Sequence, residues 1–270
     1  MKAVPALGAK NYSSEANLLK RKIFAGYFKP KINLAREIFK LLKLKANEKV
    51  LDVGCGNGDL LIELRHKYHH TGPLYGLDIA NGILKKAVLA SRASGSKINF
   101  SVGDARNIKF SENYFDAVII KHVLHNIPDY ERAMAECHRV LKKGGRLALA
   151  VTGQKTRIIL KRLKPKIAKL LGLDFYPYGE GRASLESITQ DINKNLWRYQ
   201  VHKYKGVAGL KKVKPYLDYV DSGRDFWGQI DNKKWRIALD FSKRYLEAIL
   251  KQKGVIKDQV IMGIIVAVKK

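Results

Sequence analysis

The chain has 270 residues, which is long enough to bury one large core or one domain with an elaborate cap. Apolar residues make up 46% of it, an ordinary share for a globular protein, and the longest apolar run, residues 260–268, is far too short to span a bilayer. The 52 basic and 24 acidic residues give a formal charge of +28, which indicates an anionic partner rather than any particular fold.

The first elements in chain order are helices. Apolar residues recur at helical spacing over residues 11–28 and again over residues 33–44, so both segments are predicted to be helical. A short apolar run with β-branched residues follows at 49–53, and this pattern is typical of a buried parallel strand. Glycines 54, 56 and 58 then alternate before the apolar residues that begin a helix over 59–68.

This glycine turn has the pattern D-x-G-x-G-x-G from Asp52 to Gly58. It is not the dinucleotide fingerprint G-x-G-x-x-G, because the third glycine of that pattern would fall on Asp59. It is not a P-loop either, because no lysine followed by serine or threonine ends it. A strand that turns into a helix N-terminus presents free backbone N–H groups, so the turn is predicted to bind an anionic group. A purely structural turn is the alternative.

The second strand is predicted over residues 74–78 and ends on Asp78, 26 residues after Asp52. A carboxylate at this position can accept hydrogen bonds from both hydroxyls of a ribose, while the alternative is a helix N-cap. A helix over 81–93 and a strand over 98–102 follow, and this strand leads into Gly103, Asp104 and Ala105.

The fourth strand, over 114–120, runs into the segment K-H-V-L-H-N-I-P-D at 121–129. Asp129 is predicted to cap a helix that reaches residue 141, a tight turn follows at 142–146, and the fifth strand occupies 147–151. The last turn and strand lie within the segment R-V-L-K-K-G-G-R-L-A-L.

Taken together, these motifs resemble those of the class I S-adenosylmethionine (SAM) dependent methyltransferases, of the small-molecule type found in ubiquinone and menaquinone biosynthesis. The resemblance covers about 100 residues, from 50 to 151. It implies SAM as cofactor and a Rossmann-like α/β fold with seven mostly parallel strands. The last strand would be antiparallel and inserted beside the fifth, with a helical cap formed by the N-terminal segment and C-terminal insertions.

The resemblance also assigns roles to individual residues. Asp78 would hold the ribose, Asp104 would meet the adenine amino group, and the backbone N–H of Ala105 would meet a ring nitrogen. The full set expected to bind the cofactor is Asp52, Gly54, Gly56, Gly58, Asp78, Ile79, Asp104, Ala105 and Lys121. Tyr12 and Tyr27 are candidate lid residues, with simple packing as the alternative.

The two histidines after the fourth strand, His122 and His125, would lie close to the transferred methyl group. Methyl transfer from SAM is an in-line displacement in which the protein chiefly positions the reactants, so a general base is needed only if the acceptor must first lose a proton. His125 is the better candidate for that base, and a structural histidine is the alternative for both.

The C-terminal part is more basic than the centre. Residues 50–150 carry a net charge of +4, whereas residues 1–49 carry +9 and residues 151–270 carry +15. Residues 154–171 contain seven basic and no acidic residues among apolar ones, with Pro165 expected to kink the segment. Such a segment lies on an anionic membrane, follows phosphates, or packs its apolar face on the core as a cap helix. A solvated lysine-rich surface would also account for the charge.

Further elements are a helix over 184–196, a sixth strand over 197–204, helices over 216–227 and 232–253, and a last strand over 258–269. The predicted organisation is therefore an N-terminal helical lid (1–48), a SAM-binding core (49–153), a basic cap segment (154–183), and remaining strands with a helical insertion (184–270).

Three hypotheses for function follow. The first is methyl transfer to a small-molecule or lipid- or quinone-like acceptor. The second is methylation of RNA at a ribose or ring nitrogen, although the K-H-V-L sequence stands where enzymes that methylate exocyclic amines carry an N/D-P-P-Y/F motif. The third is a non-catalytic SAM-binding protein at a membrane surface. Two cysteines, Cys55 and Cys137, form no metal-binding pattern, so no metal is expected. Free thiols fit a reducing compartment, so the protein is predicted to be cytoplasmic, and peripheral at a membrane in some of these hypotheses.

Overall fold

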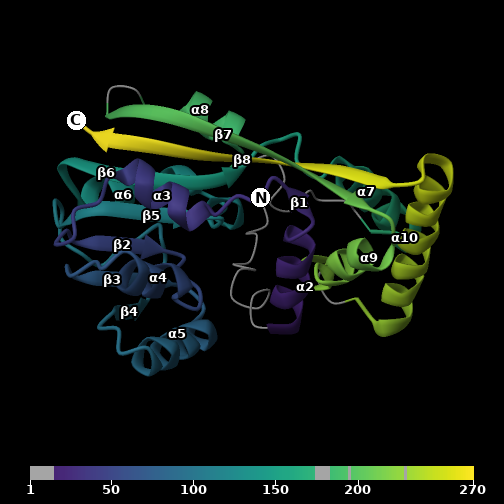
Figure 1. Cartoon of the computed structure of the whole chain (residues 1–270), viewed down its shortest axis with the longest axis horizontal. Coiled ribbons are helices and arrows are strands. Elements are labelled where there is room, and N and C mark those ends of the chain that lie inside the picture. Colours follow the sequence, from purple (N-terminus) through teal and green to yellow (C-terminus); the bar gives the residue numbers. More distant parts are fainter. Residues whose placement is uncertain (1–14, 174–182, 194–195, 228–229) are drawn as a thin grey trace.

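The computed structural model describes residues 15–173, 183–193, 196–227 and 230–270. Its centre is an eight-stranded sheet in the order β1-β7-β8-β6-β5-β2-β3-β4 (Figure 1). Five neighbouring strands are parallel to one another, namely β2 (Val50–Val53), β3 (Leu74–Asp78), β4 (Asn99–Val102), β5 (Phe115–Lys121) and β6 (Leu141–Thr152). The expected Rossmann-like α/β fold is confirmed.

The other side of the sheet contains the antiparallel pairings. β8 (Ile256–Lys269) lies between β6 and β7 (Trp197–Leu210) and is antiparallel to both, as expected for the last strand. β7 extends six residues beyond the predicted end of the sixth strand, and the two-residue strand β1 (Phe28–Lys29) pairs with this extension. The described sheet therefore has one strand more than the seven expected, because a two-residue strand carries no readable periodicity in sequence.

Helices cover both faces of the parallel part. One face packs against α3 (Leu34–Leu42) and α4 (Asp59–Lys67), and the other packs against α6 (Tyr130–Val140) and α8 (Leu185–Asp191). Successive residues of β5 alternate between the two cores, with Ala117 and Ile119 in one and Val118 and Ile120 in the other. A strand buried on both faces must be apolar throughout, which explains the unbroken apolar run in the sequence. The helix α5 (Asn81–Ala93) flanks β4.

Helix bounds follow local capping signals. Asp129 accepts a hydrogen bond from the backbone N–H of Arg132 and begins α6, as predicted. Ser184 begins α8 with a capping box that includes Ser187, but α8 ends at Asp191 rather than at residue 196 because Ile192 returns to extended backbone. The fifth predicted strand is also longer than expected, since Leu141 already pairs with Phe115.

A separate group of helices forms a cap at one end of the molecule. It consists of α2 (Glu15–Ala25), α7 (Ile158–Leu171), α9 (Lys214–Asp221) and α10 (Asn232–Lys253), and the long strands β7 and β8 reach out to it (Figure 1). These helices share their own apolar core, in which Phe24 packs against the rings of Phe28, Tyr216 and Tyr219. Two short 3-10 turns complete the described elements, Leu124–Asn126 and Arg224–Trp227.

The basic segment at 154–171 contains α7, and the apolar face of this helix packs on the core as a cap helix. Leu163 and Ile167 are fully buried in the core of the cap, so the apolar face of α7 is covered by protein and is not available to a bilayer. Pro165 lies inside the helix on its exposed side. Across the described ranges, no helix has the length and apolar character needed to cross a membrane.

Candidate active site

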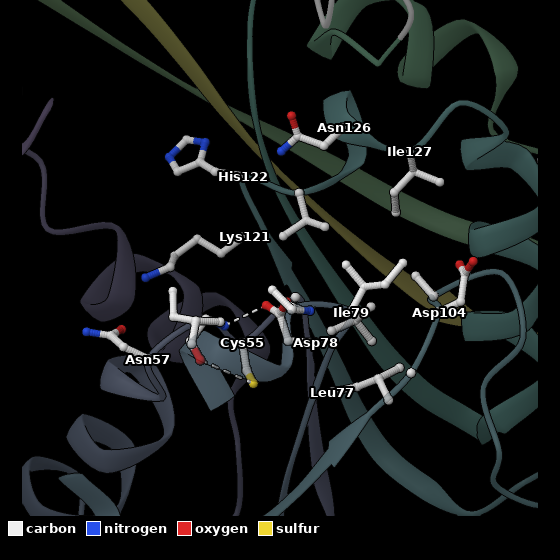
Figure 2. A pocket seen from close by; sticks show the side chains of 18 of the residues that line it. Cys55, Asn57, Leu77, Asp78, Ile79, Asp104, Lys121, His122, Asn126 and Ile127 are labelled. Atoms are coloured by element: carbon white, nitrogen blue, oxygen red, sulfur yellow. Dashed lines mark hydrogen bonds between the residues drawn. The ribbon is translucent and has the colours of Figure 1, made fainter. Parts of the chain in front are cut away.

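A cavity of about 350 Å³ opens at the carboxyl ends of the parallel strands, which is where ligands bind in open α/β sheets. Its volume lies within the range of small-molecule sites. Most of its lining comes from four segments: the glycine turn after β2, the end of β3, the loop after β4 and the loop after β5 (Figure 2). From the predicted set, the lining includes Gly54, Gly56, Asp78, Ile79, Asp104, Ala105, Lys121 and His122.

The glycine turn approaches its neighbours closely. Gly54 has a φ of +72°, and a Cβ added there would lie 2.2 Å from a methyl carbon of Val123 in the loop after β5. Gly56 has a φ of +56°, and its nearest neighbour would be Ile83 at 3.7 Å, so the space beside its backbone remains available to a ligand. Both positions require glycine, the first because of packing and backbone conformation and the second because of backbone conformation.

Gly58 has a different place. It is the N-cap of α4 with a φ of +78°, and an added Cβ would meet the ring of Phe100 at 2.9 Å and Ala87 at 3.3 Å. Since Gly58 does not line the cavity, its role in the structure is to let α4 pack closely on the neighbouring strand and helix.

Asp78 joins the end of β3 to the glycine turn. One carboxylate oxygen accepts the backbone N–H of Gly56 at 2.9 Å (Figure 2). The other accepts the backbone N–H of Ala80 at 2.9 Å. Each oxygen keeps a further acceptor site, so the carboxylate is oriented by the backbone and still able to bind hydroxyl groups. The next side chain, Ile79, is 42% exposed and supplies an apolar wall to the cavity.

Asp52 lies beneath the cavity and does not line it. It is 2% exposed, and its Oδ1 atom has no hydrogen-bond partner. Burial raises the pKa of Asp52 to about 7, the positive charge of Lys121 opposes this rise, and the negative charge of Asp78 adds to it. Buried polar atoms are rarely left without a partner, so this oxygen fits a cationic group or an ordered water brought by a ligand.

The loop after β4 carries an ion pair. Arg106 donates from Nε to Asp104 Oδ1 at 3.0 Å and from Nη2 to Oδ2 at 2.6 Å, and these bonds hold the pKa of Asp104 below its usual value. Asp104, Ala105 and Arg106 all line the cavity. Asp104 therefore offers only its remaining lone pairs to an adenine amino group.

The loop after β5 closes the side of the cavity away from Leu77 and Asp78 (Figure 2). His122 adopts a φ of +58° and donates its backbone N–H to Ala150 at 2.9 Å. Burial, together with nearby positive charges, lowers the pKa of His122 to about 3 and that of His125 to about 4. Both rings are uncharged at neutral pH. His125 does not line the cavity, whereas Asn126, which sequence reasoning missed, does.

The N-terminal helix reaches the cavity through a residue that was not predicted. Lys22 of α2 lines the cavity and pairs with Asp59 at 3.5 Å. Tyr27 is 40% exposed in the turn before β1 and is absent from the lining, while Tyr12 lies outside the described residues. Periodicity predicted the helix, but not which of its polar residues points inward. Asn57 and Arg106 were also missed, although both stand next to predicted residues in the motifs.

The residues present fit SAM. The cavity combines an oriented carboxylate at the end of β3, a glycine backbone with open space beside it and apolar walls. Next to its lining residue Val53 lies Asp52, with an unpartnered buried carboxylate oxygen. In the part of the chain that the structure describes, no group of three or more His, Cys, Asp or Glu residues could hold a metal ion.

Comparison with known proteins points the same way. A family model described as a methyltransferase domain matches residues 51–149. A demethylmenaquinone methyltransferase of Lactobacillus johnsonii is 36% identical over 154 residues, covering 53% of this chain and 63% of that protein. The one of Geobacillus stearothermophilus is 30% identical over 160 residues, covering 56% and 68%. The YcgJ protein of Bacillus subtilis superposes with a TM-score of 0.63 at 17% identity, covering 87% of this chain and 97% of that one, a likeness of fold alone.

Proposed function

Because the chain belongs to the class I SAM-dependent methyltransferases, we propose that it transfers a methyl group from SAM to a small-molecule acceptor. The chain spans 63% of the length of the Lactobacillus johnsonii relative. The observation that carries the proposal is the cavity in which the glycine turn, the Asp78 carboxylate and the loop after β5 meet.

In this proposal the chain binds and orients, while SAM supplies an electrophilic methyl group when bound. Asp78 accepts the ribose hydroxyls, and Ile79 packs against the cofactor. Asp104 and Ala105 recognise the adenine ring. The backbone at Gly54 and Gly56 approaches the methionine part, with Asp52 and Lys121 beneath it providing charge. Gly58 contributes by fixing the start of α4. Catalysis then rests on holding acceptor and methyl group in line, which alone can supply a large part of the rate enhancement.

The acceptor enters on the side of His122, Asn126 and Ile127 (Figure 2). Val123 and Pro128 add apolar surface there, which suits a ring or an alkyl chain. We therefore propose a lipid- or quinone-like small molecule as the first class to assay, and the names of the two relatives support that choice. Neutral His122 can accept a hydrogen bond from such an acceptor.

The buried free thiols of Cys55 and Cys137 suit a reducing cytoplasm.

The test combines binding and turnover. Calorimetry with SAM and with its demethylated product measures cofactor binding. The protein is then incubated with radiolabelled SAM and cell extract that has been separated into RNA, protein, lipid and small-molecule fractions. We expect label in the lipid or small-molecule fraction. Label confined to RNA or protein would contradict the proposed acceptor class, and absence of SAM binding would contradict the proposal as a whole.

A further inference from the structure

A second feature lies next to the loop after β5, in residues 153–157 between β6 and α7. Because β5 and β6 are parallel neighbours, the loops that follow them leave the sheet at the same edge. The loop is anchored to β8, since Thr156 Oγ1 donates to the Ile261 carbonyl at 2.8 Å and the Arg157 N–H donates to the Gln259 carbonyl at 2.7 Å. Arg157 is thereby held at a φ of +52°, a conformation uncommon for residues other than glycine.

The guanidinium of Arg157 has no ionic partner among the described residues. Its carbon lies 5.0 Å from the centre of the Tyr219 ring, in a cation–π contact that orients it. Its Nε atom is buried and has no hydrogen-bond acceptor. Buried donors, and charged ones above all, are normally paired, so this oriented guanidinium with an unpaired Nε indicates a ligand that brings an acceptor.

The surroundings of Arg157 are positive. The charges of Arg157, Lys164 and Arg21 all lower the pKa of His125, and those of Arg157 and Lys121 lower the pKa of His122. Among the described residues, no carboxylate contributes to either pKa. The three cations Arg157, Lys164 and Arg21 come from the loop after β6, from α7 and from α2, and they converge beside the two histidines of the loop after β5.

One carboxylate in this part of the cap, that of Asp258, already accepts hydrogen bonds from the protein. Asp258 accepts the Tyr216 hydroxyl at 2.6 Å and the Gln259 N–H at 2.9 Å. Arg21 keeps its orientation by donating from Nη2 to the Ser222 carbonyl at 2.5 Å. Among the described residues, the cations Arg157, Lys164 and Arg21 act on the two histidines at the end of the cavity where the acceptor is proposed to enter.

We propose that Arg157, with Arg21 and Lys164, binds an anionic group of the methyl acceptor, a carboxylate or a phosphate. This inference rests on the proposed function and narrows its acceptor class. A planar guanidinium matches either anion with two parallel hydrogen bonds. With the anion held there, the rest of the acceptor extends past His122 and His125 toward the cavity, so the cap fixes which molecule is presented for methylation.

The experiment separates the combined lipid and small-molecule fractions of cell extract by charge before the reaction. An anion-exchange column at neutral pH divides the pool into a retained and a flow-through fraction, and part of the retained fraction is treated with phosphatase. Each fraction is incubated with labelled SAM and either the wild-type protein, Arg157→Gln, Arg157→Lys or the control Arg162→Gln. Arg162 is an exposed residue of α7, so the control removes the same charge from the helix that follows Arg157.

We expect label to enter acceptors of the retained fraction. Arg157→Gln should lower the rate of labelling about 10- to 100-fold, as expected for loss of hydrogen bonds to a charged group. The rate of Arg157→Lys should lie between those of Arg157→Gln and the wild type, and the rate of Arg162→Gln should match the wild type. All variants should bind the demethylated cofactor equally. Loss of labelling after phosphatase treatment identifies a phosphate, and persistence identifies a carboxylate.

Other outcomes separate this inference from the proposed function. Label that enters only the flow-through fraction would contradict the proposed anion-binding site while leaving methyl transfer intact. Labelling by Arg157→Gln at the wild-type rate would have the same meaning. No label from either fraction would contradict the proposed function itself. If Arg157→Gln fails to bind the demethylated cofactor, Lys164→Gln replaces it, with the same reduction expected and the same refutation if the rate is unchanged.

Discussion

Asp78 offers the sharpest test of the proposed cofactor site, because one side chain holds the turn and lines the cavity. Asp78→Ala removes the acceptors of two backbone N–H groups, those of Gly56 and Ala80, each 2.9 Å away. Hydrogen bonds to a charged group contribute about 1.5–3 kcal/mol when buried. Because Asp78 is only half-buried and water can replace it, we expect the free energy of unfolding to fall by about 1–2 kcal/mol.

The effect on the ligand should be separate and measurable. Two ribose hydroxyls would lose their acceptor, which should cost about 1–3 kcal/mol of binding free energy. This cost corresponds to a roughly 5- to 150-fold larger dissociation constant. Asp78→Asn should fall between wild type and Asp78→Ala, because its carbonyl oxygen can still accept one N–H while its amide group opposes the other.

Calorimetry with the demethylated cofactor and thermal unfolding measure the two effects. Asp231→Ala is the control, because Asp231 caps α10 through the N–H of Lys234, within the cap helices. It should cost about 1 kcal/mol of stability and leave the affinity unchanged. Wild-type affinity in Asp78→Ala would refute the ribose assignment, and equal loss of affinity in Asp231→Ala would show that affinity merely follows stability.

Three further predictions concern the histidines, the glycine turn and the buried acid. Because the pKa of His122 is about 3 and that of His125 about 4, both are neutral above pH 5, so the pH–rate profile should lack a limb near pH 6.5. His125→Ala should lower turnover less than 10-fold, whereas a loss of about 10²–10⁴-fold would establish it as a general base. Gly54→Ala should destabilise by about 2–4 kcal/mol through its clash with Val123 and its positive φ, and Val123→Ala should recover only the packing part in thermal unfolding. Asp52→Asn should stabilise the ligand-free protein above pH 7 by up to a few kcal/mol, because the raised pKa of Asp52 makes its ionised form unfavourable in the folded state. This gain in stability should vanish toward pH 4. A difference in stability that does not change with pH would contradict the raised pKa.

Short-range signals in the sequence were enough to predict much of this fold. The helix over 232–253 has the predicted bounds, since Asp231 caps its start and Gly254 adopts the left-handed conformation after its end. The strand over 74–78 also has the predicted bounds. The placement of Asp78 beside Gly56 was predicted as well, because two adjacent parallel strands joined by one helix bring their carboxyl ends together.

Other features depend on contacts between distant parts of the chain. Sequence indicated that residues 154–171 have an apolar face, but only the packing of Leu163 and Ile167 in the cap shows that protein covers it. Lys22 reaches the cavity from a helix that precedes the glycine turn by some thirty residues, and no local pattern marks it.

The sequence by itself therefore determined the parallel core, its turns and the cofactor motif, because caps, glycine conformations and apolar periodicity act between residues close together in the chain. Only the tertiary structure decided where the basic flanks lie. The loop that carries Arg157 leaves the sheet at the same edge as the loop that carries His122 because β6 pairs with β5, and Arg21 lies on the helix α2, which packs on α9. Burial joins these residues across long stretches of chain, and it depends on all the surfaces at once rather than on any one segment.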